Sequence, residues 1–513
     1  MSDEGQSEVI AFLQGLCVAA GDASPPAATH ISRIYFAGAL VYKLKRAVRT
    51  PYLDFSTPEL RLAACEAEAA LNRRTAPALY RAVRRITREE DGLAFDGPGP
   101  LVDAVVEMNR FSDDALLDAM AMRGALTPAH MEQLANKLAA FHAGAERREG
   151  GAGRMSDVIA LNERSIAATF LTREPSLPDL LARTRDALAR NGALIDARAQ
   201  AGKVRRCHGD LTLRNIAMID GEPTPFDCLE FNEALASIDV LYDLAFTLMD
   251  LLHRAQPALA SVLFNRYLDA ADEADGLALL PLFIAMRALI RAHVTATMSE
   301  DAGDARERLR AEALAYLALA SRALNPAAPV LVGVGGLSGS GKSSVAAALA
   351  PLLAPAPGAR VLSSDRIRKA MFGAAPTQRL PQEAYAPHVS EQVYATARKQ
   401  AAQCLTQGWP VIADAVFDRP EDRDALERVA AEAGATFIGV WLDAPHAALA
   451  ARVCARTGDP SDATVDVLLQ QEAKLATRSE PMTWVRMDAT QPPQDTAAAL
   501  AAQLYSAGSR ASG

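Results

Sequence analysis

The sequence predicts an α+β domain with a small strand-rich lobe and a larger helical lobe, followed by an α/β domain built on a parallel sheet. The chain has 513 residues, whereas a single domain usually holds ~100–200 residues. An Ala/Leu-rich helical pattern ends in the proline-punctuated stretch at residues 322–329, and an apolar strand follows from Val330. We therefore predict one domain at residues 1–322 and a second at residues 330–513.

Composition and charge narrow the class of protein. Hydrophobic residues make up 50% of the chain and the net charge is -9, which is typical of a globular protein and disfavours a nucleic-acid-binding surface. The six cysteines show no Cys-x-x-Cys spacing, the first residues are acidic, and no uninterrupted apolar run approaches ~18 residues. We expect a cytoplasmic protein that binds small polar molecules, with neither nucleic acid nor membrane as a partner.

The elements of the first domain follow from local patterns. Residues 31–36 and 40–44 are expected to form a β-hairpin, residues 58–71 a helix and residues 101–108 a further strand. The remainder is predicted to be mostly helical. Its clearest helix starts after Thr127 with Pro128 at the first helical position, and its apolar face consists of Met131, Leu134, Leu138 and Phe141.

The second domain alternates strands and helices. Strands are predicted at residues 330–335, 359–363, 410–414 and 436–442, with helical segments between them. This alternation is the pattern of a parallel sheet covered by helices on both faces.

The most specific motif is Gly-Leu-Ser-Gly-Ser-Gly-Lys-Ser at residues 336–343, which matches the P-loop pattern at every fixed position. Its glycines let backbone N–H groups point at phosphate oxygens, and the following helix adds the positive end of its dipole. We expect Lys342 to contact the β- and γ-phosphates of ATP and the Ser343 hydroxyl to bind Mg²⁺. The residues predicted to bind nucleotide here are Gly336, Ser338, Gly339, Ser340, Gly341, Lys342, Ser343 and Ser344.

Two aspartates are predicted to end the second and third strands of this domain, Asp365 and Asp414. Both carboxylates should therefore emerge beside the phosphates. We assign Asp365 as the catalytic base, because Arg366 and Arg368 beside it offer local charge to an anionic or polar substrate, and Asp414 as a metal-binding residue. Helix capping is the alternative role for each aspartate.

Arg452 and Arg456 lie four residues apart, on one face of a predicted helix, and a Gly/Pro/Ser-containing hinge follows them. Such a segment suits a mobile lid whose arginines neutralise charge on the γ-phosphate during transfer. Solvated surface arginines are the alternative interpretation. With these residues in place, residues 330–505 resemble the P-loop small-molecule kinases, the group that includes gluconate kinase, chloramphenicol phosphotransferase and zeta-toxin-like kinases.

The first domain carries His208-Gly-Asp210, an asparagine at position 215 and Phe-Asp at positions 226–227. Transfer of a phosphoryl group to a hydroxyl needs a carboxylate near the acceptor, with an amide and a second carboxylate to hold magnesium. The segment resembles the catalytic loop of protein-kinase-like folds in its aminoglycoside phosphotransferase version. The resemblance implies that Asp210 is the catalytic base, that Asn215 and Asp227 bind Mg²⁺, and that His208 is an orienting residue.

Two downstream aspartates, Asp239 and Asp243, either brace the catalytic loop by accepting its backbone N–H groups or act as helix-terminal charges. Two glutamates beside Asp227, Glu230 and Glu233, either attract a cationic substrate or are ordinary surface charges.

The same resemblance implies a lysine on a strand that grips the α- and β-phosphates and a helix glutamate that holds this lysine. Lys43 and Glu68 fit these roles, with Lys45 and Glu66 as the alternatives. Residues 105–108, which include Glu107 and Met108, would form the hinge that meets adenine. Before the lysine only residues 29–32 and Gly38 are available for a phosphate-covering loop, so the hairpin is shortened.

Across nearly its full length the chain resembles bacterial bifunctional proteins that join an aminoglycoside phosphotransferase-like domain to an ATP-binding P-loop kinase domain. This resemblance implies an ATP-dependent phosphotransferase with two nucleotide sites, which uses ATP and Mg²⁺ to phosphorylate hydroxyls of small molecules. One alternative is that the first domain binds a nucleotide or metabolite without turnover and regulates the P-loop domain. Another is a P-loop ATPase whose hydrolysis drives an interaction.

Overall fold

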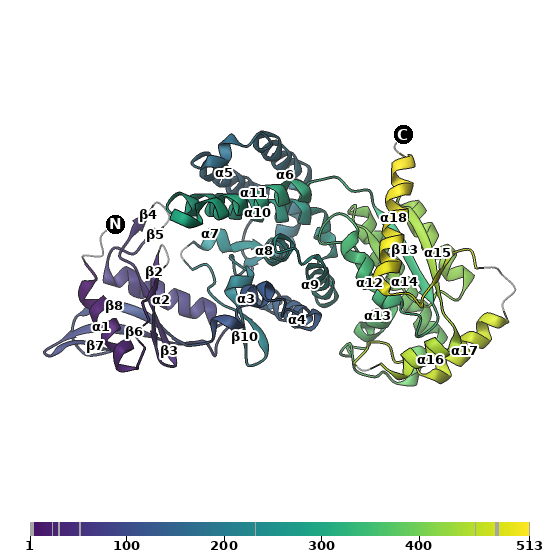
Figure 1. Cartoon of the computed structure of the whole chain (residues 1–513), viewed down its shortest axis with the longest axis horizontal. Coiled ribbons are helices and arrows are strands. Elements are labelled where there is room, and N and C mark those ends of the chain that lie inside the picture. The colour runs from purple at the N-terminus through teal and green to yellow at the C-terminus, as the bar shows by residue number, and fades with distance from the viewer. Residues whose placement is uncertain are drawn as a thin grey trace. The chain divides into compact units, whose positions relative to one another are not determined.

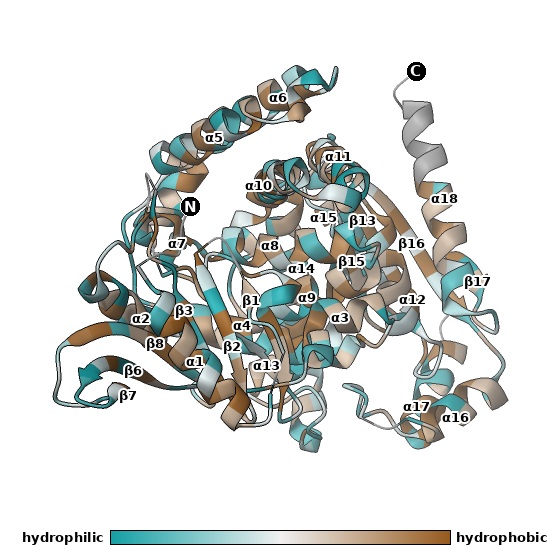
Figure 2. Ribbon diagram, turned by 60° about the vertical axis from the view of Figure 1, so that its left-hand side comes forward, coloured by the Kyte–Doolittle hydropathy of each residue, from teal (hydrophilic) through white to brown (hydrophobic). Residues whose placement is uncertain are grey.

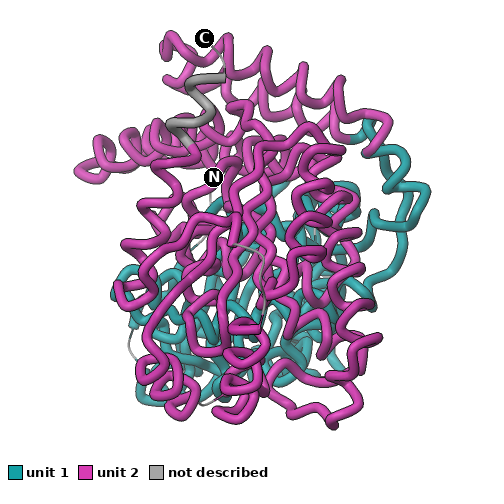
Figure 3. The backbone as a smooth tube through the Cα atoms, turned by 90° about the vertical axis from the view of Figure 1, so that its right-hand side faces the viewer, with its two compact units in different colours: residues 1–154, 195–250 teal, residues 155–194, 251–513 magenta. Residues whose placement is uncertain are grey.

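The computed structural model describes all residues except 1–4, 23, 29–30, 51–52, 231, 457, 478–481 and 512–513. The chain divides into two compact units, drawn in teal and magenta in Figure 3. The first unit comprises Met1–Arg154 and Ile195–Asp250, and the second comprises Met155–Leu194 and Leu251–Gly513. The second unit therefore joins helices from before residue 322 with the whole segment after residue 330.

The first unit begins with a six-stranded sheet in the order β1-β2-β3-β8-β6-β7, in which all neighbours are antiparallel. Its strands are β1 (Ala27–Ala28), β2 (Ser32–Ala37), β3 (Leu40–Lys45), β6 (Tyr80–Glu89), β7 (Gly92–Phe95) and β8 (Leu101–Asn109). The helix α1 (Ser7–Ala19) packs on one face of the sheet and α2 (Pro58–Asn72) on the other. The sheet is thus covered on both faces, which explains why residues 103–108 of β8 are all buried, Asp103 and Glu107 included.

Short antiparallel strand pairs and several helices make up the rest of this unit. The strands β10 (Ile216–Ile219) and β11 (Glu222–Pro225) form a hairpin, whereas β9 (Val204–Arg206) pairs with β12 (Ser237–Asp239) from a distant part of the chain. A further short pair joins β4 (Arg49–Thr50) to β5 (Leu53–Asp54), and α7 (Glu233–Ala236) precedes β12. The longer helices are α3 (Leu117–Met122), α4 (Pro128–Gly144) and α8 (Val240–His253). The α4 helix starts as the sequence predicts: the Thr127 hydroxyl accepts a hydrogen bond from the His130 N–H, and Pro128 occupies the first turn.

The second unit contains a helical part formed by α5 (Ala152–Ala167), α6 (Leu177–Gln200), α9 (Pro257–Ala270), α10 (Leu280–Glu300) and α11 (Arg306–Ala323). Teal and brown alternate along α5 and α6 in Figure 2, as in amphipathic helices. By length and composition alone, Ala274–Glu300 could cross a membrane, but 67% of its apolar window is buried inside the protein. It packs closely against α11, which is the position of a core helix.

The remainder of this unit is a five-stranded parallel sheet in the order β14-β15-β13-β16-β17. Its strands are β13 (Val330–Gly336), β14 (Arg360–Ser363), β15 (Val411–Asp414), β16 (Thr436–Asp443) and β17 (Val485–Asp488). The flanking helices are α12 (Lys342–Leu349), α13 (Ser364–Met371), α14 (Pro387–Thr406), α15 (Pro420–Glu432), α16 (His446–Cys454), α17 (Val465–Ala476) and α18 (Pro493–Ala511). The helices α12 and α18 lie side by side on one face of the sheet (Figure 1), and α14 and α15 cover the other.

The predicted fold class is confirmed, and the predicted strands and helices agree with the structure to within one or two residues at most ends. The main omissions were α1, β6, β7 and β17. In β6, charged residues interrupt the apolar pattern, and β17 is a short edge strand with two exposed charged residues. Neither strand therefore shows the periodicity on which a sequence prediction relies.

Candidate nucleotide and phosphoryl-transfer sites

The P-loop connects the central strand β13 to α12. Three of its glycines have left-handed backbone angles: φ is +144° at Gly336, +86° at Gly339 and +87° at Gly341. A Cβ atom at Gly339 would lie 2.4 Å from the Leu449 carbonyl oxygen. Both the backbone angles and the space therefore require glycine, and they bend the loop into the shape that directs its N–H groups inward.

Behind this loop the two predicted metal-binding residues are in direct contact. The Ser343 hydroxyl donates a 2.7 Å hydrogen bond to Asp414 Oδ2 at the end of β15. Burial raises the pKa of Asp414, although Lys342 opposes this shift. Hydroxyl and carboxylate oxygens are the ligands that Mg²⁺ prefers, so the donor set fits this ion.

Lys342 lies at the first position of α12, and its Nζ donates to the Leu337 carbonyl at 3.0 Å. Burial lowers the pKa of Lys342, and Asp414 and Asp365 only partly offset that effect. No carboxylate oxygen in the described part of the chain lies within ion-pair distance of this ammonium group. A phosphate group would supply the missing negative charge.

A cavity of about 750 Å³ opens around these residues. Most of the predicted site residues of this domain line it: Ser338, Gly339, Gly341, Lys342, Ser343, Ser344, Asp365, Asp414, Arg452 and Arg456. Gly336 and Ser340 are the predicted residues that do not, since they form the inner side of the loop, where Ser340 is buried.

The position of Asp365 differs from the prediction in one respect. The strand β14 ends at Ser363, and Asp365 lies in the first turn of α13 rather than at the strand end. It still faces the cavity, accepts a hydrogen bond from Ser461, and has a pKa that burial raises. The carboxylate of Asp365 therefore reaches the cavity from the first turn of α13, directly after β14 ends.

The two predicted lid arginines occupy different elements. Arg452 belongs to α16 and donates to the carbonyl oxygens of Gly339 at 3.4 Å and Ala489 at 2.8 Å. The α16 helix ends at Cys454, so Arg456 lies beyond it, 3.8 Å from Asp459. The expectation that both arginines share one helical face is therefore wrong, because the helix stops before the second one. Residue 457 of the predicted hinge lies outside the described residues.

Sequence reasoning missed the ion pair that fastens the segment after this hinge. Lys369 lies 2.9 Å from both oxygens of Asp462, and the Tyr385 hydroxyl donates to the same carboxylate at 2.5 Å. In addition, the Gln471 side chain accepts a hydrogen bond from the Ser338 N–H at 2.9 Å. These partners are separated by 77 to 133 residues, and no local pattern connects them.

In the first unit the predicted catalytic segment is assembled by the β10-β11 hairpin. The Asn215 amide donates to Asp210 Oδ2 and to the Asp210 carbonyl, both at 2.9 Å. The Phe226 N–H donates to the Asn215 carbonyl at 2.9 Å, which brings the neighbouring Asp227 to the same end of the hairpin. The oxygen atoms of Asn215 and Asp227 fit a magnesium ion.

The predicted lysine and glutamate are paired in this unit. Lys43 Nζ lies 2.8 Å from Glu68 and 2.6 Å from Asp227. Burial opposes the charge of Lys43, but the two carboxylates outweigh it and raise the pKa of Lys43 well above its ordinary value. Glu66 is exposed.

Lys45 forms a second, unpredicted pair of contacts in the same place, with Glu68 and Glu230. Glu230 is buried against Lys45, and burial raises its pKa. It is therefore neither a surface charge nor free to attract a cationic substrate, which corrects both interpretations offered for this residue. Glu233, by contrast, is exposed.

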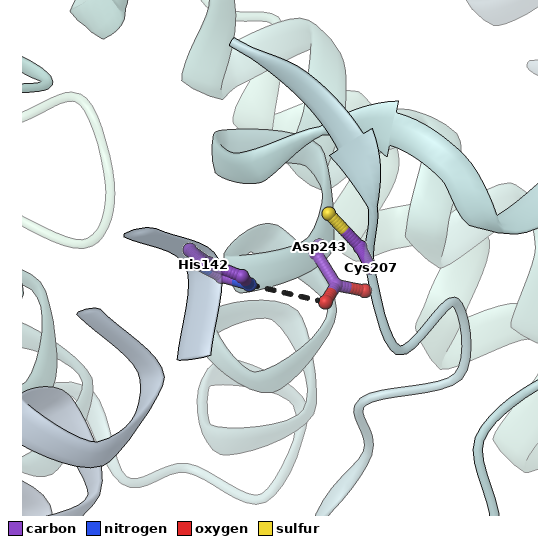
Figure 4. Close-up of side chains that lie close together, drawn as sticks. All are labelled: His142, Cys207 and Asp243. Carbon is purple, nitrogen blue, oxygen red and sulfur yellow. Dashed lines mark hydrogen bonds and ion pairs between the residues drawn. The ribbon is translucent and has the colours of Figure 1, made fainter. Parts of the chain in front are cut away.

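Asp243 braces the catalytic loop, as one of the two interpretations predicted. Its carboxylate accepts hydrogen bonds from the backbone N–H groups of His208 at 3.0 Å and Gly209 at 2.9 Å. Figure 4 shows the carboxylate also facing His142 of α4, at 3.2 Å, with Cys207 beside it. These three side chains are close enough to hold a metal ion, but Asp243 is already occupied in holding the loop.

The same helix holds the loop at two further points that sequence reasoning missed. The Thr247 hydroxyl donates to the Leu211 carbonyl at 2.7 Å, and Asp250 accepts from the Leu213 N–H at 2.9 Å. Residues 243, 247 and 250 follow the i, i+4, i+7 spacing of one helical face, which was a usable signal. Asp239 has the other predicted role, at a helix terminus: it accepts a hydrogen bond from the Leu241 N–H at 2.8 Å in the first turn of α8, and it pairs with Arg198 at 2.8 Å.

The predicted hinge residues lie near the end of β8, where this strand pairs with β3. Met108 is opposite Val41, on the same sheet face as Lys43, whereas Glu107 points to the other face and lies 3.3 Å from Arg81 and Arg84. The shortened phosphate-covering hairpin is a two-residue turn at positions 38–39, held by the Arg110 N–H, which donates to the Ala39 carbonyl at 2.9 Å. Residues 29–30 lie outside the described residues.

Two family models match separate regions of the chain. Residues 37–279 match a family model described as the phosphotransferase enzyme family, and residues 331–477 match a model described as an AAA domain. The chain thus joins a region that matches a phosphotransferase family to a region that matches an AAA domain and contains the P-loop. It is therefore a phosphotransferase.

Curated relatives of this phosphotransferase are uncharacterized proteins of Mycobacterium tuberculosis and Mycobacterium bovis. Each is 28% identical over 465 residues, covering 87% of this chain and 89% of the relative. A choline/ethanolamine kinase family protein from Mesorhizobium loti covers 63% of this chain and 95% of its own, with 15% identity and a TM-score of 0.39. The match to an APS kinase of Mycobacterium tuberculosis covers 35% of this chain and 99% of that protein, with 20% identity and a TM-score of 0.26.

Proposed function

We propose that this phosphotransferase uses ATP at two sites, one in each predicted domain (residues 1–322 and 330–513), and transfers the γ-phosphoryl group to hydroxyls of small molecules. The observation that carries the proposal is that each site groups a half-buried lysine with oxygen atoms suited to a metal ion and a further carboxylate. These are Lys342, Ser343, Asp414 and Asp365 in one site, and Lys43, Asn215, Asp227 and Asp210 in the other.

At the P-loop site, the loop N–H groups and Lys342 would hold the β- and γ-phosphates. Ser343 and Asp414 would hold Mg²⁺, which neutralises phosphate charge when bound. Asp365 has a pKa raised by burial, which suits a group that accepts the proton of an acceptor hydroxyl. Arg452 and Arg456 would stabilise the charge that develops on the transferred group.

At the other site, Lys43 would exchange its contact with Asp227 for the α- and β-phosphates while Glu68 keeps it oriented. Asp227 and Asn215 would then hold Mg²⁺. Asp210 keeps one carboxylate oxygen on the Asn215 amide, which fixes its orientation toward an acceptor hydroxyl.

Arg368 favours an acceptor of the P-loop site that carries a negative charge. Its side chain lines the cavity, is only 7% exposed and contacts neutral groups: the Ala384 carbonyl, the Ser390 hydroxyl and the Tyr385 ring. Within the described ranges, no carboxylate pairs with this guanidinium. A buried cation is usually paired, so an anionic group on the acceptor would supply the missing partner.

The cysteines support a reducing, cytoplasmic setting for this activity. All six lie in described residues, five of them are buried and none forms a disulfide, which is the usual state of thiols in the cytoplasm.

Nucleotide stoichiometry tests the two-site proposal. We expect calorimetric titration of the full chain with Mg²⁺ and a non-hydrolysable ATP analogue to give two equivalents bound. Lys342→Ala and Lys43→Ala should each remove one equivalent, and not the same one. A single equivalent that persists in both variants would reject both assigned sites.

An acceptor screen tests the chemistry. ADP release is measured with matched hydroxyl compounds that differ by one charged group, such as gluconate against glucose and glycerate against glycerol. In the Asp210→Asn background, which leaves the P-loop site, we expect the anionic members to react at least ~10-fold faster. Equal rates would reject the anionic acceptor and leave the kinase proposal standing.

A second candidate function is a P-loop kinase or ATPase regulated by a catalytically weak first domain. Two observations favour it: Lys43 is engaged by Asp227, and the phosphate-covering turn has only two residues. Binding of one analogue equivalent that Lys43→Ala removes, without any ADP release lost in Asp210→Asn, would support this alternative.

A further inference from the structure

The helix α9 lies along the outer edge of the parallel sheet, where β14 has no neighbouring strand. Both elements belong to the second unit, yet α9 falls within the region that matches the phosphotransferase family, residues 37–279. Phe264 of α9 packs against Trp409, with ring centroids 5.5 Å apart, and the Trp409 indole donates to the Gly358 carbonyl at 3.1 Å. This buried contact sets α9 beside the chain entering β14.

Asn265 of α9 takes the place of a missing neighbouring strand. Its side-chain oxygen accepts from the Val361 N–H at 2.7 Å, and its amide nitrogen donates to the Ala359 carbonyl at 3.0 Å. Residues 359 and 361 present their backbone groups to the same side of β14, as they would to another strand. Asn265 is 3% exposed, so these bonds are shielded from water.

Asp269, one helical turn further along α9, contacts the chain on both sides of Asp365. One oxygen lies 2.7 Å from Arg360 at the start of β14, and the other lies 3.6 Å from Arg366, the residue after Asp365. Arg360 also donates to the Asn265 carbonyl at 3.1 Å and is 6% exposed. The corner between β14 and α13 is thus held at its start and at its end.

We infer that Asn265 and Asp269 are positioning residues for Asp365, so that α9 of the phosphotransferase-family region completes the P-loop kinase site. The inference rests on the proposed role of Asp365 as acceptor-side base. Lys342 and Ser343 lie on α12, which follows the central strand β13. Asp414 ends β15, which pairs with β14 on one side but is also held by β13 on the other. Displacing β14 should therefore disturb proton acceptance while leaving nucleotide binding intact.

The test uses the full chain in the Asp210→Asn background, with ADP release to water as the measured reaction. The variants are Asn265→Leu, which removes both edge hydrogen bonds, and Asp269→Asn, which removes the charge that clamps Arg360 and Arg366. Asp269→Glu restores that charge. Asn191→Leu is the matched control, because Asn191 makes the same helical amide bond to residue i−4, to Ala187 at 2.9 Å, but contacts no part of β14.

We expect Asn265→Leu and Asp269→Asn to lower kcat about 10-fold with KM for MgATP within about twofold of the parent, since nucleotide contacts are unchanged. Asp269→Glu should recover most of the rate. Hydrogen exchange of residues 359–371 should speed up in the two disruptive variants and in no other part of the parallel-sheet region. Asn191→Leu should match the parent in all three measurements.

Unchanged kcat and unchanged exchange at residues 359–371 would overturn the inference. The inference would also be overturned if KM for MgATP rose in proportion to the loss of kcat and hydrogen exchange became faster across the whole second unit. That result would mean general unfolding. If Lys342→Ala releases ADP as fast as the parent, the proposed P-loop function fails instead. Exchange at residues 359–371 would then decide alone whether Asn265 and Asp269 hold the Asp365 corner.

Discussion

The half-buried lysines of the two proposed nucleotide sites have opposite surroundings. Lys43 in the first unit lies within 2.8 Å of two carboxylates, Glu68 and Asp227. Lys342 in the second unit contacts the Leu337 carbonyl, and no described carboxylate comes within ion-pair distance of it. The pKa of Lys43 is accordingly raised well above its ordinary value, whereas burial lowers that of Lys342.

This difference follows from how each site is built. The P-loop is a contiguous stretch whose backbone already has the shape that binds phosphate, so little has to move when a nucleotide arrives. The proposed site of the first unit is built from side chains of β3, α2 and the segment around the β10-β11 hairpin, and Lys43 and Asp227 neutralise each other there. A bound phosphate would have to displace Asp227 from Lys43. We therefore expect the P-loop site to be preorganised and the site of the first unit, called the side-chain site below, to give up an internal ion pair first.

Lys342→Ala should have the largest effect, because the preorganised site relies on one lysine. Losing charged contacts to two phosphates at about 2 kcal/mol each weakens binding of MgATP by roughly 1,000-fold. Calorimetry in a Lys43→Ala background, which leaves only the P-loop site, measures this affinity. Arg398→Ala serves as control, since Arg398 lies outside the cavity. A loss under tenfold would contradict the reliance on one lysine.

Asp210→Asn should lower turnover at the side-chain site by ~100-fold or more, the usual scale for a general base. Turnover is measured with an acceptor that still reacts in the Lys342→Ala protein, so that only the first unit contributes. The amide keeps the size of the carboxylate and its contact with Asn215, so folding should be unaffected. A rate equal to that of Lys342→Ala alone would show that Asp210 is not the base.

The contrast between contiguous and dispersed sites also explains what the sequence could predict. Residues 336–343 form a local motif, and its strand, loop and helix were predicted together with Ser343 and Asp414. The catalytic segment of the first unit was predictable for a related reason: Asp210, Asn215 and Asp227 come from one short stretch, closed by a hairpin.

Contacts between distant segments were beyond sequence reasoning. Glu230 pairs with Lys45 across 185 residues, and Asn265 caps β14 across 96 residues. Each depends on how whole elements pack, and a lone glutamate or asparagine carries no signal of it. Helix ends were the other failure: Arg456 lies beyond α16, because local spacing does not reveal where a helix stops.

Asp243→Asn should have a smaller, local effect on the side-chain site. The carboxylate accepts from two backbone N–H groups, and an amide can accept only one of these bonds while its nitrogen faces the other donor. We expect a cost of about 2 kcal/mol, seen as faster hydrogen exchange at residues 207–215 and slower turnover at this site. The P-loop site is the internal control. Equal exchange in both proteins would mean that Asp243 does not hold the loop.

The pH dependence of binding should show the smallest difference between the sites. A protonated lysine attracts phosphate, so affinity falls as pH rises through the lysine pKa. Four groups act on Lys342: Asp414, Asp365 and Asp459 favour its charge and Arg456 opposes it, yet burial lowers its pKa below the ordinary 10.5. Lys43 has a pKa well above that value.

Between pH 8 and pH 10 we therefore expect affinity for the ATP analogue to fall about threefold at the P-loop site and to stay constant at the side-chain site. The sites are measured separately in Lys43→Ala and Lys342→Ala proteins. Bound phosphate raises the pKa of either lysine, so the change reports the free protein, where the two lysines differ. If affinity fell equally with pH at both sites, the two lysines would not differ in pKa as described. A steeper fall at the side-chain site would mean that Lys43, not Lys342, has the lower pKa.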